Sequence, residues 1–366
     1  MPFARCGLFL LVLSAAPLRV VAAEADAERA AFTAYDTVKV ADGIHAFMPR
    51  RTDTPIVSGN SIAVIGDDGV LVVDSGHFPS ATRRMIGEIR ALTRQPVRFL
   101  VNTHWHPDHI RGNAIYREAF PGVAIVSTSS TRDPFDSDFD RDEPALMRDQ
   151  LGKVRRALET GKSSSGAELT DRQRKYLGEG ARELELMLPD IAQAPTLKPS
   201  LTFSEAITLH LGKREVKVMF LGRGNTGGDA VVYVPDSKVL ITGDLVVYPA
   251  PYAFGSFIGE WAPTMRKLIG IDAQAIVPGH GPVMRDKAYL TLLAELLESV
   301  SSQVRQAAKE GLSLEDVRKK LDVQRFREGF ARGNEEIGRA FDGFFLGPGV
   351  PRAYREAKEG PLHDET

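Results

Sequence analysis

Three of the eight histidines and one aspartate lie within six residues, in the stretch His104-Trp105-His106-Pro107-Asp108-His109. Imidazole nitrogen and carboxylate oxygen are the usual ligands of zinc and related metals. The apolar stretch 97–101 precedes this loop and predicts a buried strand, which would hold the loop rigidly at its end. The spacing therefore predicts a metal site rather than a histidine-rich surface loop.

Three later loops also follow short apolar stretches and carry possible ligands. They contain Asn225 within the glycine-rich loop 222–229, Asp244 after the stretch 239–242, and His280 in Pro278-Gly279-His280-Gly281. Each loop alone is weak evidence for a metal site, because glycine with aspartate after a strand usually forms only a turn. Together with the first loop, they predict one metal centre built at the ends of several strands.

The first half of the chain has the pattern of short paired strands. Residues 37–48 contain the turn signal Asp42-Gly43, and the apolar stretches 60–65 and 70–73 are joined by a second turn. Ser80 is expected to cap a helix that runs to about Leu92. These elements lie directly before the strand that leads to the histidine loop.

Residues 128–200 differ in character and predict a helical insertion. Two helical patterns occupy about 143–160 and 170–188, separated by a Ser/Gly linker. Thr170 and Gln173 have the spacing of a capping box at the start of the second helix. The insertion would interrupt the two strand-rich halves of the protein.

The strand pattern returns after residue 200. Short stretches at 207–211, 216–221 and 230–234 alternate with turn residues, and 284–308 has leucines at helical spacing. Because strands followed by helices occur twice, the sequence predicts an α+β fold, in which two strand-rich halves pack as a sandwich with helices outside. Residues 286–366 are expected to form a helical C-terminal extension.

The N-terminus has the pattern of a secretory signal peptide over residues 1–23. Arg5 precedes an apolar run, and Val21-Ala22-Ala23 resembles a cleavage site before Glu24. The alternative, an uncleaved anchor, has an apolar run shorter than the roughly 20 residues that a membrane span needs. Cleavage would remove Cys6, the only cysteine, which would exclude disulfides and thiolate ligands. The expected location is the periplasm or the outside of the cell.

With these motifs, the chain over about residues 38–285 resembles the metallo-β-lactamase superfamily of metallohydrolases. The resemblance implies a four-layer αββα sandwich, with the metal site at one edge between the two sheets. It also implies the ligands: one metal held by His104 and His106 with a third residue, another held by Asp108, His109 and His280, and Asp244 bridging the two. We therefore expect a metallo-β-lactamase-like domain at 24–285 that contains the insertion.

Asn225 departs from the family pattern, which has its third histidine ligand at this position. An amide oxygen binds zinc more weakly than imidazole does, so we expect two zinc ions of unequal affinity, with the first site the weaker. The alternative is that Asn225 caps the following turn and contacts no metal. A branch of the superfamily with a Gly-Asn-Thr loop has the same change, so Asn225 does not indicate an inactive enzyme.

The ligand set predicts hydrolysis by a metal-bound hydroxide, because a metal lowers the pKa of bound water from 15.7 to about 7. Asp108 is expected to orient the hydroxide and to pass a proton to the leaving group. Asp74 is expected to hold the histidine loop in place, and His77 either reaches the site or makes a structural hydrogen bond. The aromatic side chains expected to line the substrate pocket are Trp105, Tyr248 and Tyr252.

The predicted function is a zinc-dependent hydrolase that cleaves a small ester, lactone, amide or β-lactam. One rival is an enzyme of the same fold that uses a single iron to oxidise a thiol or persulfide, and a second is a non-catalytic binding protein. A formal net charge of −2 gives no basic field for nucleic acid. The expected partner is a small molecule, with no membrane after signal cleavage, and a homodimer is left open.

Overall fold

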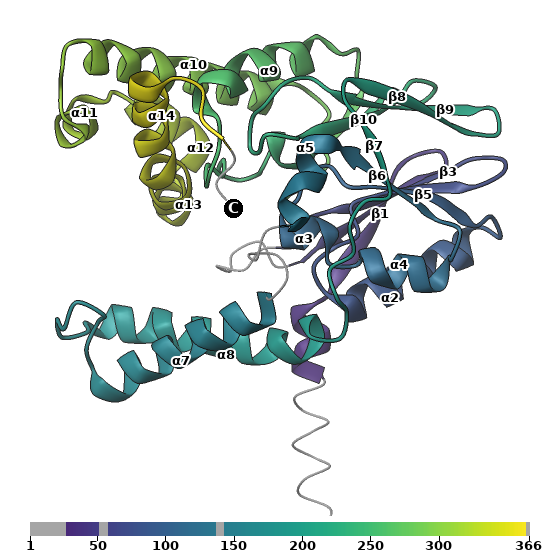
Figure 1. The fold of residues 1–366 in the computed structure, drawn as a ribbon, viewed down its shortest axis with the longest axis horizontal. Coiled ribbons are helices and arrows are strands. Elements are labelled where there is room, and N and C mark those ends of the chain that lie inside the picture. Colours follow the sequence, from purple (N-terminus) through teal and green to yellow (C-terminus); the bar gives the residue numbers. More distant parts are fainter. Residues whose placement is uncertain (1–26, 51–57, 137–142, 364–366) are drawn as a thin grey trace, which may run out of the picture.

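Two β-sheets face each other in the computed structural model, which describes residues 27–50, 58–136 and 143–363 (Figure 1). The predicted signal peptide lies outside the described residues. The first sheet has the order β1-β2-β3-β4-β5-β6-β7, and the second has the order β12-β11-β10-β9-β8. In the first sheet, β1 to β4 are antiparallel neighbours and β4 to β7 are parallel neighbours.

The first sheet forms where the sequence predicted paired strands. Gly43, in the turn between β1 and β2, has a φ of +66°, which glycine adopts more easily than other residues. The bounds of the strands are β1 Tyr35–Ala41, β2 Ile44–Pro49, β3 Ser61–Ile65, β4 Val70–Val73, β5 Val97–Val101, β6 Ala124–Thr128 and β7 Leu201–Phe203.

The second sheet is an antiparallel meander that ends in one parallel pair. Strand β11 runs parallel to β12, and α9 (Ile258–Gly270) connects them. The loops with Asp244 and His280 follow the ends of these two strands. The bounds of the strands are β8 Ala206–Leu211, β9 Arg214–Phe220, β10 Ala230–Val234, β11 Val239–Ile241 and β12 Ala275–Val277.

Three layers of apolar contact hold the molecule together. Val64, Val73 and Val232 belong to the core between the two sheets. A second core packs α2 (Pro79–Leu92) and α4 (Asn113–Ala119) against the outer face of the first sheet. A third core packs α9 and α10 (Ala288–Lys309) against the second sheet. The predicted αββα sandwich is therefore confirmed.

The helical insertion is a hairpin of α7 (Glu143–Thr160) and α8 (Asp171–Ile191). The predicted capping box is present, since the Thr170 side chain accepts from the Gln173 backbone N–H and the Gln173 side chain accepts in return from the N–H of Thr170. The short helices α5 (Ser129–Arg132) and η1 (Asp133–Asp136) precede the hairpin. The hairpin extends from the sandwich on the same side as the C-terminal helices (Figure 1).

The C-terminal extension is helical, as predicted. After α10, its elements are α11 Leu314–Lys320, α12 Gln324–Ala331, α13 Glu335–Ala340, the π-helix η3 Phe341–Leu346 and α14 Gly347–Glu359. Phe326, Phe341 and Phe345 are completely or almost completely buried and join the core of the second sheet. In the described part of the chain, no helix combines the length and the hydropathy needed to cross a membrane.

The start of α2 differs from the prediction. Phe78, and not Ser80, is the N-cap, because Pro79 already occupies the first turn, where its missing N–H costs nothing. The Ser80 hydroxyl instead donates to Asp190 of α8 at 2.6 Å. A tertiary contact with the insertion therefore replaces the local capping bond.

Candidate metal centre

Each candidate ligand follows the end of a strand, at one edge of the sandwich. His104 and His106 follow β5, and the short helix α3 (Pro107–Ile110) carries the next two candidates. Asp244 lies in the single turn η2 (Gly243–Leu245) after β11, and His280 follows β12. Parallel strands end at the same edge of a sheet, so β5 with its neighbours and the pair β11–β12 deliver these loops to one place.

His104, His106 and Asp244 form the first group of possible ligands. The Nε2 atom of His104 lies 2.9 Å from Nδ1 of His106 and 3.6 Å from Oδ2 of Asp244. The potential ligand atoms all lie within 4.8 Å of one another, so a single cation could contact all three.

Asp108, His109 and His280 form the second group. Oδ2 of Asp108 lies 3.3 Å from Nε2 of His109 and 3.2 Å from Nε2 of His280. Oδ1 of Asp244 lies 3.2 Å from the same atom of His109 and 3.3 Å from that of His280. Asp244 therefore presents one carboxylate oxygen to each group, which is the geometry of a bridging ligand.

Mutual attraction sets the protonation of the second group. Burial would raise the pKa of Asp108 and Asp244, but the neighbouring histidines outweigh it and hold both values well below the ordinary range. Burial would lower the pKa of His109 and His280, but the carboxylates raise the first well above its ordinary value and the second to about 9. A cation that binds among these carboxylates and imidazoles would therefore displace protons from the imidazoles.

In the first group, burial dominates the protonation of the two histidines. Burial, followed by the charge of His109, lowers the pKa of His104 well below its ordinary value. Burial also lowers the pKa of His106, against the attraction of Asp244 and Asp108. Both imidazoles therefore favour the neutral form, which is the form that binds metal.

Asp74 fixes the histidine loop. Its carboxylate accepts hydrogen bonds at 2.8 Å from the backbone N–H and from the hydroxyl of Thr103, and lies 2.8 Å from Nδ1 of His109. A proton on Nδ1 leaves Nε2 of His109 free to face the centre. Asp74 itself has a φ of +57°, an uncommon conformation that aspartate tolerates better than most residues.

Asn225 is buried beside the loop that follows Asp244. Its Nδ2 donates to the backbone carbonyl of Tyr252 at 2.9 Å, which fixes the orientation of the amide. Its Oδ1 is buried and has no hydrogen-bond partner among the residues that the structure describes. The side-chain oxygen of Asn225 is therefore open to a ligand, while its side-chain nitrogen holds the backbone at Tyr252.

The three aromatic residues predicted to bind substrate lie in different places. Tyr252 and Asp108 both line a cavity at the candidate metal centre. Trp105 packs in a small apolar cluster with Ile110 and Phe135. Tyr248 packs against Tyr289, with ring centroids 5.4 Å apart. Trp105 and Tyr248 are not among the residues that line this cavity.

His77 lies on the cavity wall, and its side chain hydrogen-bonds to the insertion. Its Nε2 lies 2.9 Å from Glu143, the first residue of α7, and Glu143 also forms an ion pair with buried Arg111. The structural hydrogen bond predicted for His77 is thus present. Glu143 and Arg111 were missed in the sequence, because no local pattern links residues that lie 32 positions apart.

A cavity of about 720 Å³ opens onto the metal centre. His106 and Asp108 form one wall, and the side chains of α7 and α8 form the opposite wall. The cavity is large enough for a small organic substrate. The helical insertion thus forms part of the site.

The residues fit a pair of divalent cations. Among the described residues, Asp108 Oδ2 and Asp244 Oδ1 are buried and make no well-formed hydrogen bond, although the Nε2 atoms of His109 and His280 lie 3.2–3.3 Å away. Buried carboxylate oxygens without donors are costly unless a cation compensates them. The mixed imidazole and carboxylate set is the one that zinc prefers, and soft ligands such as cysteine are absent from both groups.

Comparison with known proteins decides the family. The sequence pattern of the metallo-beta-lactamase superfamily matches residues 54–280, which is more than half of the chain. The chain belongs to the metallo-beta-lactamase superfamily. The predicted family is therefore confirmed, and membership supports a metal-dependent hydrolase, whereas zinc and the number of ions stay predictions.

Relatives within the superfamily have different activities. The chain is 24% identical over 268 residues to a linear primary-alkylsulfatase of a Pseudomonas species, and it spans about half of that relative's length, since the match covers 48% of it. It resembles the structure of a metallo-beta-lactamase from Pontibacter korlensis, with 21% identity and a TM-score of 0.50 over 72% of this chain and 99% of that chain. It also resembles the sec-alkylsulfatase Pisa1 from Pseudomonas sp., with 15% identity and a TM-score of 0.61 over 88% of this chain and 50% of that chain.

Proposed function

We propose that the protein is a metal-dependent hydrolase that binds two zinc ions of unequal affinity and cleaves an ester, lactone, amide or β-lactam. The observation that supports it is the arrangement of Asp244, which presents one oxygen to His104 and the other to His109 and His280. Metals bound there would activate a water molecule and polarise the substrate oxygen. The cavity beside these residues supplies the place for the substrate.

Two residues of the cavity, Asp108 and Tyr252, transfer the proton and orient the substrate. Asp108 lies at the cavity wall, where its carboxylate accepts a proton from the attacking water and returns it to the leaving group. Tyr252 faces the same cavity. Burial, and then the charges of Asp108 and Asp244, raise the pKa of Tyr252, so its hydroxyl keeps its proton and donates a hydrogen bond to the substrate.

A sulfate ester is a specific candidate for the substrate. The likeness to the sec-alkylsulfatase extends over 88% of this chain, against 72% for the metallo-beta-lactamase, and the sequence relative is a linear primary-alkylsulfatase. The identity of 15% is evidence for the fold alone. This candidate therefore belongs in the first substrate panel, beside the carboxylic esters.

The test is a hydrolysis panel with zinc added in steps. The panel contains nitrocefin, a lactone, an aryl ester, a phosphodiester and an alkyl sulfate. We expect turnover of at least one substrate, saturation at two zinc ions per chain, and loss of turnover in His109→Ala. Protein purified with one iron and no hydrolysis would support the thiol-oxidising rival, and a function that survives His109→Ala would support the binding protein.

We also propose that the protein is exported and that residues 1–23 are removed. The basis is the sequence pattern at the N-terminus. Mass spectrometry of protein recovered from the periplasm or the medium should show a chain that begins at Glu24. A chain that begins at Met1 in that fraction would contradict the cleavage.

A further inference from the structure

The mouth of the catalytic cavity is apolar. Leu146 of α7, Tyr176 of α8 and Phe254 line it and are 48%, 58% and 45% exposed. They are three of the five large hydrophobic residues that are exposed in the described part of the chain. Apolar side chains gathered at a site, and not scattered over the surface, mark a binding surface.

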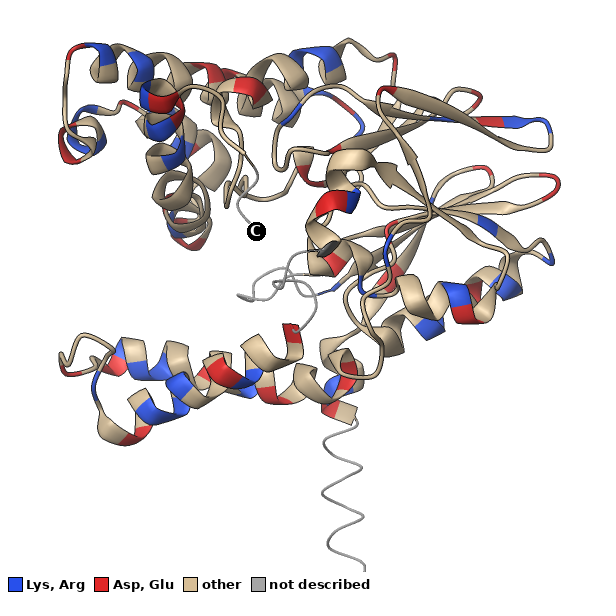
Figure 2. Ribbon diagram, in the orientation of Figure 1, with Lys and Arg blue, Asp and Glu red and all other residues tan. Residues whose placement is uncertain are grey.

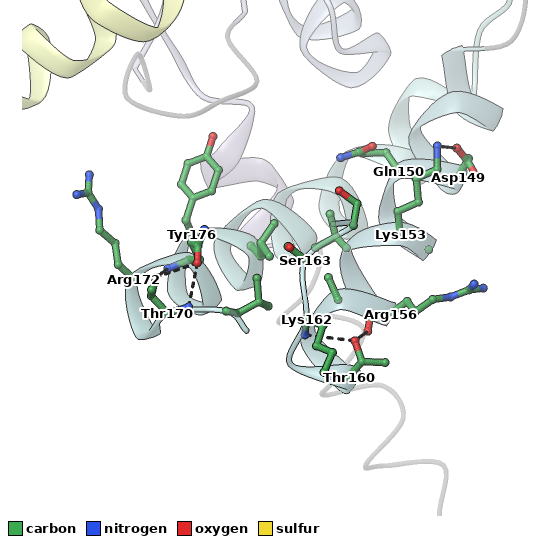
Figure 3. A pocket seen from close by; sticks show the side chains of 17 residues that line it. Asp149, Gln150, Lys153, Arg156, Thr160, Lys162, Ser163, Thr170, Arg172 and Tyr176 are labelled. Carbon is green, nitrogen blue, oxygen red and sulfur yellow. Dashed lines mark hydrogen bonds and ion pairs between the residues drawn. The ribbon is translucent and has the colours of Figure 1, made fainter. Parts of the chain in front are cut away.

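A second cavity, of about 1210 Å³, lies along the helical hairpin (Figure 3). Six residues line both cavities: Asp149, Gln150, Lys153, Val154, Tyr176 and Leu177. Val154 and Leu169 are buried and contribute to the apolar floor between α7 and α8. The two cavities therefore form one groove that leads from the metal centre toward the tip of the hairpin.

The part of this groove that lies in the second cavity has more cations than acids. The hairpin as a whole is balanced, with nine Lys or Arg and nine Asp or Glu between Glu143 and Ile191, and both signs are visible along it in Figure 2. The lining of the second cavity contains one acidic residue, Asp149, against the four cations Lys153, Arg156, Lys162 and Arg172. The positive residues thus gather at the groove.

Three of these cations have no ion pair with any described residue: Arg156, Lys162 and Arg172. Lys153, in contrast, pairs with Asp149 at 2.6 Å. The side chains of Arg156 and Arg172 extend outward from opposite sides of the groove (Figure 3). Long cationic side chains can cover an apolar floor with their methylene groups and keep the charge at the solvated rim.

We propose that the groove binds a long apolar chain of the substrate, and that Arg156, Lys162 and Arg172 bind an anionic group at the far end of that chain. This inference rests on the proposed hydrolase function and names its substrate class. Glu143 lines the catalytic cavity and Arg156 lies thirteen residues further along α7, about 20 Å at the rise of an α-helix. The anionic group therefore binds far from the cleaved bond.

The apolar part is tested by filling the groove. Gly152 lines it, and a Cβ atom added there meets no other atom within 4 Å, so Gly152→Leu keeps the helix and obstructs the groove. Gly178 of α8 is equally open and lines neither cavity, which makes Gly178→Leu the matched control. The substrates carry the ester identified in the panel on a butyl, a dodecyl or an ω-carboxydodecyl chain.

We expect Gly152→Leu to raise KM roughly tenfold for both long substrates and to leave the butyl substrate unchanged. Gly178→Leu should change none of them. The charge is tested with Arg156, Lys162 and Arg172 all replaced by Gln. We expect the native protein to prefer the carboxylated chain about fivefold over the methyl-terminated one, and the triple variant, or the native protein in high salt, to lose that preference.

Binding of dodecanedioate, measured by calorimetry, separates this inference from the proposed function because it needs no turnover. Binding that Gly152→Leu weakens, in a protein that hydrolyses nothing, would support the groove and overturn the hydrolase. Hydrolysis with no preference for chain length or for the terminal charge would leave the hydrolase and overturn the groove. A chain that instead dimerises through the hairpin, with dodecanedioate unbound, would also overturn it.

Discussion

The metal centre depends on contacts that orient the ligands as much as on the ligands themselves. Asp74 contacts both Thr103 and His109, and so it links the end of β5 to α3. Its left-handed backbone conformation costs free energy that the fold has to compensate. A residue held in this way has a positioning role, because its carboxylate selects the tautomer of His109.

Asp74→Asn tests this role without altering the backbone, since asparagine tolerates the same φ. We expect metal affinity to fall about tenfold, because His109 loses the charged acceptor that orients its ring. Competition against a chelator measures the affinity. Asp42→Asn, at an exposed turn, is the control, and an unchanged affinity in Asp74→Asn would contradict the positioning role.

Asn225 has an open acceptor, and its substitution decides between the two interpretations of this residue. If Oδ1 binds the first metal, Asn225→Ala lowers the affinity of the site with His104 and His106 about tenfold or more and leaves the second site unchanged. Metal titration followed by mass spectrometry of the intact protein counts the ions. Two ions bound with unchanged affinity would show that Asn225 only holds the carbonyl of Tyr252.

At the scale of elements, the helical hairpin is attached to the sandwich close to the metal centre. Glu143, at the start of α7, pairs with His77 and with Arg111, whose side chain is 2% exposed. At the other end, Asp190 of α8 accepts from Ser80. At that end, Leu186, Met187 and Ile191 of α8 also pack against Phe78 and Ala81. The start of α7, in contrast, is attached through polar contacts, and its position depends on the charge of Glu143.

Burial alone would raise the pKa of Glu143, but His77 and Arg111 outweigh it and the pKa falls below its ordinary value of 4.5. A carboxylate with a lowered pKa stabilises the fold above its unfolded pKa, and this stabilisation is lost as the pH falls through the folded pKa. The attachment of α7 should therefore weaken below about pH 4.5. Amide hydrogen exchange in α7 should rise there before exchange in β5.

Glu143→Gln should reproduce this effect at neutral pH. It removes the charge of Glu143 from its contact with buried Arg111, which costs about 2 kcal/mol. Thermal unfolding measures the loss of stability, and hydrogen exchange locates it. Glu159→Gln, at an exposed position of the same helix, should change neither. Equal behaviour of the two variants would mean that the contact with Arg111 does not hold the hairpin.

Local sequence patterns predicted these helices and strands well, but they could not predict contacts between residues that are far apart in the chain. The capping box of Thr170 and Gln173 is encoded within four residues, and it is present. Ser80 is also a capping residue type near the start of a helix, but it is used differently, because Asp190 reaches it from 110 residues away. The meeting of the candidate ligands at one edge was predictable because they follow strands, whereas Glu143 and the groove depend on where the insertion folds back.

At the scale of the whole molecule, the C-terminal extension packs against the loop that carries Tyr252 and Phe254. Phe344 of η3 contacts the rings of Tyr252 and Phe254, with centroids 5.0 and 6.3 Å apart, and its carbonyl accepts from the backbone of Ala253. Its neighbour Phe345 is fully buried in the core that covers the second sheet. Of these two adjacent residues, Phe344 therefore faces the loop with Tyr252 and Phe254, and Phe345 faces the core.

This arrangement predicts different results for the two phenylalanines. Phe345→Ala should cost about 3–5 kcal/mol, because it leaves a cavity in the shared core, and the extension and the sandwich should still unfold in a single thermal transition. Phe344→Ala should cost less stability and should lower kcat/KM, because Tyr252 and Phe254 lose the ring that holds them at the cavity. Two separate transitions in Phe345→Ala, or unchanged turnover in Phe344→Ala, would show that the extension folds and acts independently of the site.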